Sequence, residues 1–322
     1  TALVKTLIDK YKSTVVNLDK LTYAANETAF IDYVNNDKYI FYQTDICNTE
    51  EISNIIAIEE PDKIIHLAAE SHVDRSIESS SDFIQTNIIG TYNLLEVSRK
   101  YFEGLEGKKK KNFTFHHVST DEVFGDLEIE DPGFNELTGY NPSSPYSASK
   151  ASSDHLVRAW SRTYGLPIYV TNCSNNYGPR QHQEKLIPTI INRLLNKKNI
   201  PIYGSGKQIR DWLYVYDHAE AIIKVSNSGL IGHTFNIGGN AERTNLEVVK
   251  AIWDVLKNDL NHPCTDGRDF EDTIEHITDR PGHDLRYAID PTKILNKLNW
   301  EPSETFKSGF KKTIEWYIND NS

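Results

Sequence analysis

The strongest chemical signal in the sequence is a tyrosine followed four positions later by a lysine, Tyr146 and Lys150. Residues at positions i and i+4 share one face of a helix, so the ammonium can lower the pKa of the phenol and also reach a bound ribose. A phenolate made accessible in this way can remove a hydroxyl proton while a hydride leaves the same carbon. The pattern is common by chance, and an ordinary exposed pair is the alternative.

A hydroxyl and two carboxylates, Thr120, Asp121 and Glu122, directly follow an apolar strand expected over 113–118. Two adjacent acids in a partly dry site titrate apart, which leaves one protonated as an acid and the other ionised as a base. That division suits the elimination of water, because the base takes a carbon-bound proton while the acid protonates the leaving hydroxyl. The alternative is that Asp121 caps a short turn.

Histidines contribute weaker signals. His72 closes a run of small residues after the strand expected over 63–68 and is either a ligand or an ordinary lone histidine. His116 and His117 are neighbours on a strand, so they point to opposite faces and are expected to be structural. No His/Glu spacing indicates a metal site, and no metal is expected.

The candidate side chains follow different strands, so the fold must bring the ends of those strands together. Leu3, Leu7, Ile8 and Tyr11 lie on one helical face, and a β-branched strand follows at 14–19. Further strands are expected at 39–43, 63–68, 113–118 and 168–173, and helices at about 50–59, 82–101 and 146–164. Apolar strands that alternate with helices predict an α/β fold with a doubly wound parallel sheet, which binds ligands at the carboxyl ends of its strands.

The chain is expected to divide near residue 175. Residues 1–175 are the sheet domain, and residues 176–322, punctuated by proline and glycine, are predicted to form a smaller α+β domain. A segment near 207–240, with a helix at 216–226 and a strand at 234–237, is expected to return to the first domain.

Charge argues against nucleic acid as a partner. The 322 residues carry 35 Lys+Arg and 46 Asp+Glu, a net charge of −11, and the only dense basic run, at 108–111, is expected to be a solvated loop. Against this acidic background Lys185, Arg210 and Arg280 are candidate cations for a pyrophosphate, with surface ion pairing as the alternative.

Composition predicts a soluble, cytoplasmic protein. Mean hydropathy is −0.53, and no apolar stretch approaches the ~20 residues of a spanning helix. The three cysteines, Cys47, Cys173 and Cys264, are far apart and form no Cys-x-x-Cys pair, so neither a disulfide nor a zinc site is expected.

A dinucleotide-binding unit opens with a strand, a glycine-rich turn and a helix, and an acidic residue about 20 residues further on bonds the adenosine ribose. Asp19 ends a strand as that acid would, but the chain begins at Thr1 inside the expected helix, without the glycine-rich loop and without any Met. We therefore expect the first strand and the loop to lie upstream of Thr1. The alternative is that Asp19 caps a turn before Leu21.

Together these motifs resemble the extended short-chain dehydrogenase/reductase superfamily and, within it, the dTDP-glucose 4,6-dehydratases. The similarity covers nearly the whole chain, through the stretches 19–24, 45–46, 67–74, 119–125, 146–150, 172–179, 184–188, 201–203, 208–215 and 279–290. It implies a bound NAD that is reduced and reoxidised within one turnover. The sequence departs from the family in lacking the glycine-rich loop and at 180–183, where an aromatic-rich spacer is expected.

The resemblance implies a role for each catalytic candidate. Tyr146, supported by Lys150, would deprotonate the glucose 4-hydroxyl as hydride moves to NAD, with Thr120 bonding the same oxygen. Glu122 would remove the proton from carbon 5, and Asp121 would protonate the departing 6-hydroxyl before hydride returns to carbon 6. The product would be a 4-keto-6-deoxy sugar of the kind used in rhamnose-type biosynthesis.

The resemblance also implies two binding sets. The NAD set comprises Asp19, Lys20, Leu21, Thr22, Asp45, Ile46, Leu67, Ala68, Ala69, Ser71, Thr86, Tyr146, Lys150 and Asn176. The nucleotide-sugar set comprises Ser71, Thr120, Asn175, Lys185, Leu186, Pro201, Ile202, Tyr203, Arg210, Asn245, Asp279, Arg280 and His283.

Other activities stay open at this stage. UDP-glucose and GDP-mannose 4,6-dehydratases use the same chemistry. A UDP-hexose 4-epimerase would carry small or neutral residues at Asp121 and Glu122, and a non-catalytic NAD-binding scaffold would have no reason to keep the motifs together. The helical faces at 82–101 and 147–164 resemble the four-helix interface of a homodimer, although such helices also simply cover sheets.

Overall fold

The apolar runs predicted as strands form parallel ladders. The computed structural model describes residues 1–279 and 283–320. β3 (Lys63–His66), β4 (Thr114–Thr120), β5 (Ile168–Cys173) and β9 (Thr234–Ile237) form a four-stranded parallel sheet in that order. The predicted α/β class with a parallel sheet is confirmed.

A second parallel ladder holds β1 (Val15–Asp19) against β2 (Tyr39–Gln43). No ladder joins β1 to β3 in the described part of the chain, so the predicted sheet is divided in two. Contact between the parts runs through helices: α1 (Ala2–Asp9) packs on α9 (Val215–Ser226), and Glu220 accepts bonds from Lys10 at 2.7 Å and Tyr11 at 2.6 Å.

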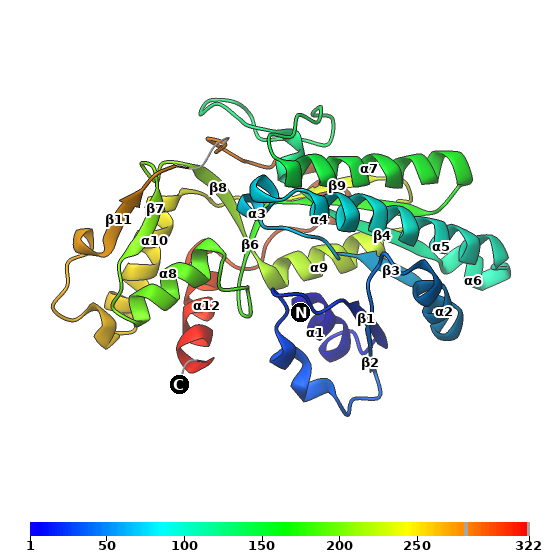
Figure 1. Ribbon diagram of the computed structural model, residues 1–322, viewed down its shortest axis with the longest axis horizontal. Coiled ribbons are helices and arrows are strands. Elements are labelled where there is room, and N and C mark those ends of the chain that lie inside the picture. The colour runs from blue at the N-terminus through cyan, green and yellow to red at the C-terminus, as the bar shows by residue number, and fades with distance from the viewer. Residues whose placement is uncertain (280–282, 321–322) are drawn as a thin grey trace.

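Helices cover both faces of the four-stranded sheet. Side chains alternate along each strand, so apolar side chains point to both faces and both must be buried. On β5, Ile168 and Val170 pack with α2 (Thr49–Glu59), α5 (Thr91–Gly104) and α7 (Pro145–Tyr164), whereas Tyr169 packs with α9. α5 and α7 run side by side (Figure 1). His116 and His117 do point to opposite faces, the first toward Ser226 of α9 and the second toward Asp154 of α7.

The helix predicted over 82–101 forms with an irregular start. α4 (Ser81–Phe83) leads into a π-helical segment, η2 (Ile84–Gly90), before α5 begins. The basic run at 108–111 is not a loop as predicted, because it lies in a short exposed helix, α6 (Gly107–Asn112), where Lys109 pairs with Glu60. The remaining short elements of this half are η1 (Glu27–Tyr33), α3 (Val73–Glu78) and η3 (Asp121–Phe124).

The second half packs around its own apolar core. β6 (Asn175–Tyr177), β8 (Ile209–Tyr214) and β10 (Glu242–Thr244) form one sheet, and β7 (Ile200–Tyr203) pairs with β11 (Ile274–Ile277). α8 (Leu186–Leu195), α10 (Asn245–Asp254) and α12 (Phe306–Asp320) surround the core, and smaller elements are η4 (Val255–Asp259), η5 (Pro263–Thr265), η6 (Glu271–Thr273) and α11 (Thr292–Leu298). Among the described helices, none is both long and apolar enough to cross a membrane.

Candidate active site

Helix α7 begins at the site and presents Tyr146 and Lys150 on one face. Ser144 and Ser147 form a capping box, and Pro145 occupies the first turn, so the local sequence specifies where the helix starts. Both side chains are buried, at 8% and 4% exposure. The Lys150 Nζ donates to the carbonyl of Val118 at 2.9 Å, which holds the pair against the end of β4.

The end of β4 brings three further candidates to the same place. Thr120 is hydrogen-bonded to Tyr146 and also to Asp121, whose Oδ1 lies 3.2 Å from the threonine hydroxyl. The Thr120 oxygen caps η3 by accepting from the Glu122 amide at 3.3 Å, so the strand end and the turn position both acids. The structure therefore gathers the predicted hydroxyl, phenol, ammonium and two carboxyls.

Electrostatics favour the protonated form of Asp121. Burial raises the pKa of Asp121 well above that of an ordinary carboxyl, and the nearby charges of Glu122 and Asp211 raise it further. Burial and the charge of Glu122 likewise raise the pKa of Tyr146, and the hydrogen bond with Thr120 only opposes that shift. The lowering of the phenol pKa that the Tyr146–Lys150 spacing predicts is therefore wrong for this structure, because burial outweighs it. Asp121 consequently holds a proton at higher pH than a solvated carboxyl does, as a general acid requires.

The first candidates for the NAD site gather at the carboxyl ends of β1 and β2. Asp19 ends β1 and accepts from the Leu21 amide at 2.8 Å, and Leu21 adopts a positive φ of 54° that turns the chain. Lys20 pairs with Asp45 at 2.7 Å, which ties the β1 loop to the residues after β2. Thr22 and Ile46 lie on the same two loops.

The residues after β3 form an open ledge. Leu67 and Ala68 are exposed, and Ala69 and Ser71 follow on the same loop. Asn87, which the sequence argument missed, fixes this ledge: it accepts from the Glu70 amide at 2.8 Å and donates to the Glu70 carbonyl at 3.0 Å and to Ser149 of α7 at 2.8 Å. In the sequence, the only indication that Asn87 lies at the site is that it directly follows the candidate Thr86. Both residues lie in η2.

Two polar side-chain atoms at the ends of these strands lack a hydrogen-bond partner within the described structure. Among the described residues, the Ser119 Oγ and Asn175 Oδ1 are buried with no hydrogen-bond partner. Asn176 is turned away from this pair, since its amide donates to the Ser174 carbonyl at 3.0 Å and accepts from His218 at 2.9 Å. Orphaned polar atoms beside an open backbone ledge fit a polar dinucleotide, as the NAD prediction requires.

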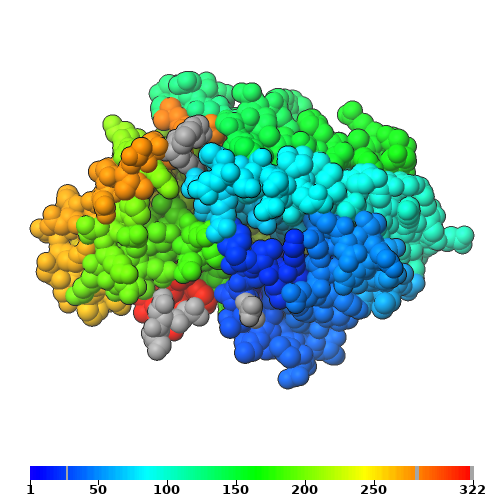
Figure 2. Space-filling view, viewed as in Figure 1, coloured from blue at the N-terminus to red at the C-terminus, as the bar shows by residue number. Residues whose placement is uncertain are grey.

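The second half meets the first across a polar junction. Lys185 donates from Nζ to the Ser71 carbonyl at 2.9 Å, and Glu184 accepts from Arg75 at 2.7 Å. The Arg75 guanidinium stacks 3.6 Å from the ring centroid of Tyr23, on the loop after β1. Figure 2 shows the cyan segment that contains Arg75 lying against the green segment near residue 185. His72 lies 3.6 Å from Glu184 and belongs to this junction rather than to the Tyr146 cluster.

Arg210 does not point into open space. It is 6% exposed, donates to the carbonyls of Ile209 at 2.7 Å and Asp284 at 3.0 Å, and stacks 4.3 Å from the ring of Tyr287. Tyr287, a second residue that the sequence argument missed, is buried near both Arg210 and Glu122, and burial raises the pKa of its phenol.

The remaining nucleotide-sugar candidates line the second half. Asp279 accepts from Gln208 at 2.9 Å and lies 2.6 Å from Nδ1 of His283, whose ring is 6.3 Å from that of Tyr203. Leu186 begins α8, Asn245 begins α10, and Pro201 and Ile202 lie in β7, where the Ile202 side chain is buried in the core. Arg280 lies outside the described residues.

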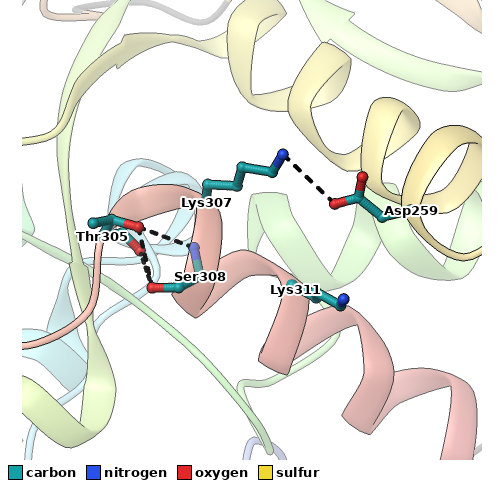
Figure 3. Close-up of a pocket in the computed structure, with 5 residues that line it drawn as sticks. All are labelled: Asp259, Thr305, Lys307, Ser308 and Lys311. Atoms are coloured by element: carbon teal, nitrogen blue, oxygen red, sulfur yellow. Dashed lines mark hydrogen bonds and ion pairs between the residues drawn. The ribbon is translucent and has the colours of Figure 1, made fainter.

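A surface hollow at the start of α12 contains none of these candidates. It is lined by Asp259, Thr305, Lys307, Ser308 and Lys311 (Figure 3). Lys307 lies 3.8 Å from Asp259, and Thr305 bonds Ser308, so polar groups of the hollow pair with one another. We assign it no function.

Comparison with known proteins gives full-length matches. The family described as GDP-mannose 4,6 dehydratase matches residues 1–313. A dTDP-glucose 4,6-dehydratase of Escherichia coli is 55% identical over 99% of this chain and 91% of its own length, and one of Haemophilus influenzae is 51% identical over 100% and 95%.

Solved structures agree in fold. The dTDP-glucose 4,6-dehydratase DesIV from Streptomyces venezuelae, with NAD and TYD bound, has a TM-score of 0.88 at 35% identity and covers 99% of this chain and 93% of its own. A UDP-glucose 4-epimerase from Thermotoga maritima has a TM-score of 0.85 at 26% identity, with 100% and 96% covered.

Proposed function

This chain belongs to the GDP-mannose 4,6-dehydratase family, and we propose that it is an NAD-dependent enzyme that converts dTDP-glucose to dTDP-4-keto-6-deoxyglucose and water. The observation that carries the proposal is the meeting of Tyr146 and Thr120 with Asp121 and Glu122 at the end of β4. An oxidation needs only the phenol and its partners. The two acids add the means to eliminate water.

The first step uses the residues at the start of α7. Tyr146 takes the proton of the sugar 4-hydroxyl, and the bound Thr120 hydroxyl holds the same oxygen in place. Lys150 stabilises the phenolate form by its charge. The ledge residues after β3 would hold NAD beside the sugar 4-oxygen, and the cofactor would supply the acceptor for the hydride of carbon 4 and the donor of that hydride to carbon 6.

The second step uses the acid pair. The 4-ketone acidifies the hydrogen on carbon 5, and Glu122 removes it. Asp121 donates its proton to the departing 6-hydroxyl, which leaves as water. Glu122 then returns its proton to carbon 5 as carbon 6 receives the hydride. The raised pKa of Asp121 supports this division, because a carboxyl that stays protonated can act as the acid while its neighbour acts as the base.

We assign NAD to the first half, residues 1–175, with help from Asn176. Asp19, Lys20, Leu21 and Thr22 hold the adenosine ribose, and Asp45 and Ile46 hold the adenine. The ledge residues Leu67, Ala68, Ala69 and Ser71, together with Thr86, Tyr146 and Lys150, contact the remainder. The exposed ledge and the orphaned Ser119 oxygen support this assignment.

We assign the nucleotide sugar mainly to residues 176–322. Lys185, at the junction with Ser71, and the buried Arg210 supply positive charge, and Arg280 adds a third cation on sequence grounds. The Arg210 guanidinium bonds the Asp284 carbonyl and stacks on the ring of Tyr287. Its role therefore includes positioning Tyr287 beside Glu122. The remaining contacts come from Asn175, Leu186, Pro201, Tyr203, Asn245, Asp279 and His283, and from the main chain of Ile202, whose side chain is in the core.

The substrate choice rests on two observations. The relatives that match over the whole chain at more than half identity are named dTDP-glucose 4,6-dehydratases. The Asp121–Glu122 pair distinguishes the site from a 4-epimerase, which has no water to eliminate.

We further propose that the enzyme works in the cytoplasm as a homodimer. The cysteines Cys47, Cys173 and Cys264 are free thiols, as in a reduced compartment. α5 and α7 together expose Tyr92 at 43% and Tyr164 at 46%, with Trp160 edge-on between them at 5.7 and 5.6 Å. Such an aromatic strip suits the four-helix contact with a second copy.

A direct assay tests the function. The purified protein is incubated with NAD and, separately, with dTDP-glucose, UDP-glucose or GDP-mannose, and the 4-keto-6-deoxy product is followed by its absorbance in alkali and by mass loss of water. Turnover of dTDP-glucose above the other two sugars is expected. Turnover of UDP-glucose or GDP-mannose alone would leave the reaction class standing and refute the substrate.

A further inference from the structure

A buried carboxylate lies one helical turn beyond Lys150. Asp154 is 0% exposed and lies 3.1 Å from Nε2 of His117 on β4. Its Oδ2 accepts hydrogen bonds from the Tyr140 hydroxyl at 2.7 Å and from the Asn172 amide at 3.2 Å. Burial lowers the pKa of His117 to about 4, so these three neighbours are neutral near pH 7. An anion held in a dry interior by neutral donors still needs a cation.

Two cations flank this carboxylate on its own helix. Lys150 and Arg158 stand four residues to either side of Asp154 and therefore on the same face of α7. Arg158 is half-buried and reaches Asp154 indirectly, by donating to the Tyr140 hydroxyl at 2.7 Å. Lys150 is buried, at 4% exposure, so its charge and that of Asp154 act on each other through a dry interior.

The other titratable groups that face Lys150 are neutral. They are His66 of β3, His117 of β4 and Cys173 of β5. Burial lowers the pKa of His66 well below its usual value and raises the pKa of the Cys173 thiol to about 12. Asp154 is therefore the anion that faces Lys150 among the described residues. The acids Asp121 and Glu122 face Tyr146 instead.

The titration behaviour of the pair agrees with the geometry. Burial lowers the pKa of Lys150, and the charge of Asp154 opposes that shift. Burial by itself would raise the pKa of Asp154, but the His117 contact and the Lys150 charge bring it down to about 2. The charge of Asp154 thus favours the protonated form of Lys150, and the charge of Lys150, after the His117 contact, favours the ionised form of Asp154.

We propose that Asp154 is a positioning residue that keeps Lys150 protonated and fixed beside Tyr146. The inference rests on the proposed function, because the charge of Lys150 matters to turnover only if Tyr146 is the base. Asp154 acts through Lys150 and takes no part in bonding the substrate. Without its charge, Lys150 loses its proton at lower pH, and the phenolate of Tyr146 loses its stabilising cation.

The test is the pH profile of Asp154→Asn, which removes the charge and keeps the size. The rate constant kcat for dTDP-glucose is measured across about pH 5 to 10 for the wild type and the variant, with folding checked by circular dichroism at each pH. The alkaline decline of kcat is expected to move down by about one pH unit or more, because the negative charge that favours the protonated ammonium of Lys150 is gone. A merely structural role would lower kcat without moving this limb.

Two further variants control the experiment. Tyr140→Phe removes a neutral donor from Asp154 but keeps the carboxylate, so the alkaline limb should stay in place. Asp154→Glu restores the charge and should move the limb back toward the wild type. If Asp154→Asn does not fold, Asp154→Ser removes the same charge, and the same downward shift of the alkaline decline of kcat is expected.

The outcomes separate this inference from the proposed function. An unchanged alkaline limb in a folded variant without the charge overturns the role of Asp154 alone. A wild-type enzyme that fails to turn over dTDP-glucose overturns the proposed function and this inference with it.

Discussion

The ammonium of Lys150 donates a hydrogen bond to the carbonyl of Val118 at 2.9 Å, and this contact fastens the start of α7 to the strand that carries Thr120. Two residues later the same strand ends in Thr120, whose hydroxyl is bonded to Tyr146. This hydrogen bond is thus one of the contacts that hold the phenol and the acid pair on neighbouring elements.

Replacing Tyr146 with phenylalanine should abolish the first proton transfer. General base catalysis contributes about 10²- to 10⁴-fold, so we expect kcat to fall by at least that range while the far-ultraviolet circular dichroism stays unchanged. Tyr101→Phe, which removes a phenol that bonds the Pro61 carbonyl far from the site, is the matched control and should retain activity. Full activity in Tyr146→Phe would refute its role as the base.

Neutralising the acids should separate oxidation from elimination. In Asp121→Asn and Glu122→Gln, Tyr146 and Lys150 are untouched, so substrate should still be oxidised while release of water slows by about 10²- to 10⁴-fold. Rapid mixing should then show reduced cofactor accumulating at 340 nm. Glu128→Gln, an exposed acid of the loop that follows, serves as the control. Variants that lose the oxidation as well would contradict the assigned roles.

Removing Asn87 should loosen the ledge after β3. Its side chain makes three hydrogen bonds that tie Glu70 to Ser149, and a loss of about 1.4 kcal/mol would weaken NAD binding about tenfold. Isothermal titration calorimetry of Asn87→Ala with NAD measures this effect, and the exposed Asn54→Ala is its control. Unaltered affinity would show that the ledge holds its shape without Asn87.

Buried histidines should make the fold sensitive to acid. Burial lowers the pKa of His116 to about 3, and that of His117 and His218 to about 4, from 6.5. Below about pH 6.5 the unfolded chain takes up protons that the folded chain excludes, so each residue costs ~1.4 kcal/mol of stability per pH unit until its folded pKa is reached.

Urea unfolding between about pH 7 and pH 5 measures that slope. His218→Gln should reduce it by ~1.4 kcal/mol per unit, and His276→Gln, an exposed residue, should leave it as it is. A stability that does not change over this range would mean that these histidines titrate normally.

A charge placed on the aromatic strip should split the proposed dimer. Tyr92→Asp puts a carboxylate beside Trp160, where association would have to desolvate it. Light scattering after size exclusion should give twice the 36.8 kDa of one chain for the wild type and a single chain for the variant. Ile129→Asp, at an exposed apolar residue away from these helices, should remain dimeric.

The sequence by itself determined the parts of this protein that depend on spacing along the chain. The i and i+4 relation of Tyr146 and Lys150, and the direct succession of Thr120, Asp121 and Glu122 after an apolar strand, follow from backbone geometry that adjacent residues share. Strand positions and the opposite orientations of His116 and His117 follow from the same periodicity.

Only the tertiary structure decided the contacts between distant segments. Asn87 meets Ser149 across 62 residues, Arg210 turns to the carbonyl of Asp284 rather than outward, and Asp154 lies against His117. No local pattern encodes such pairs, because they arise when helices and strands pack and each buried polar atom must find a partner. The division of the parallel strands into two ladders is a property of the same packing.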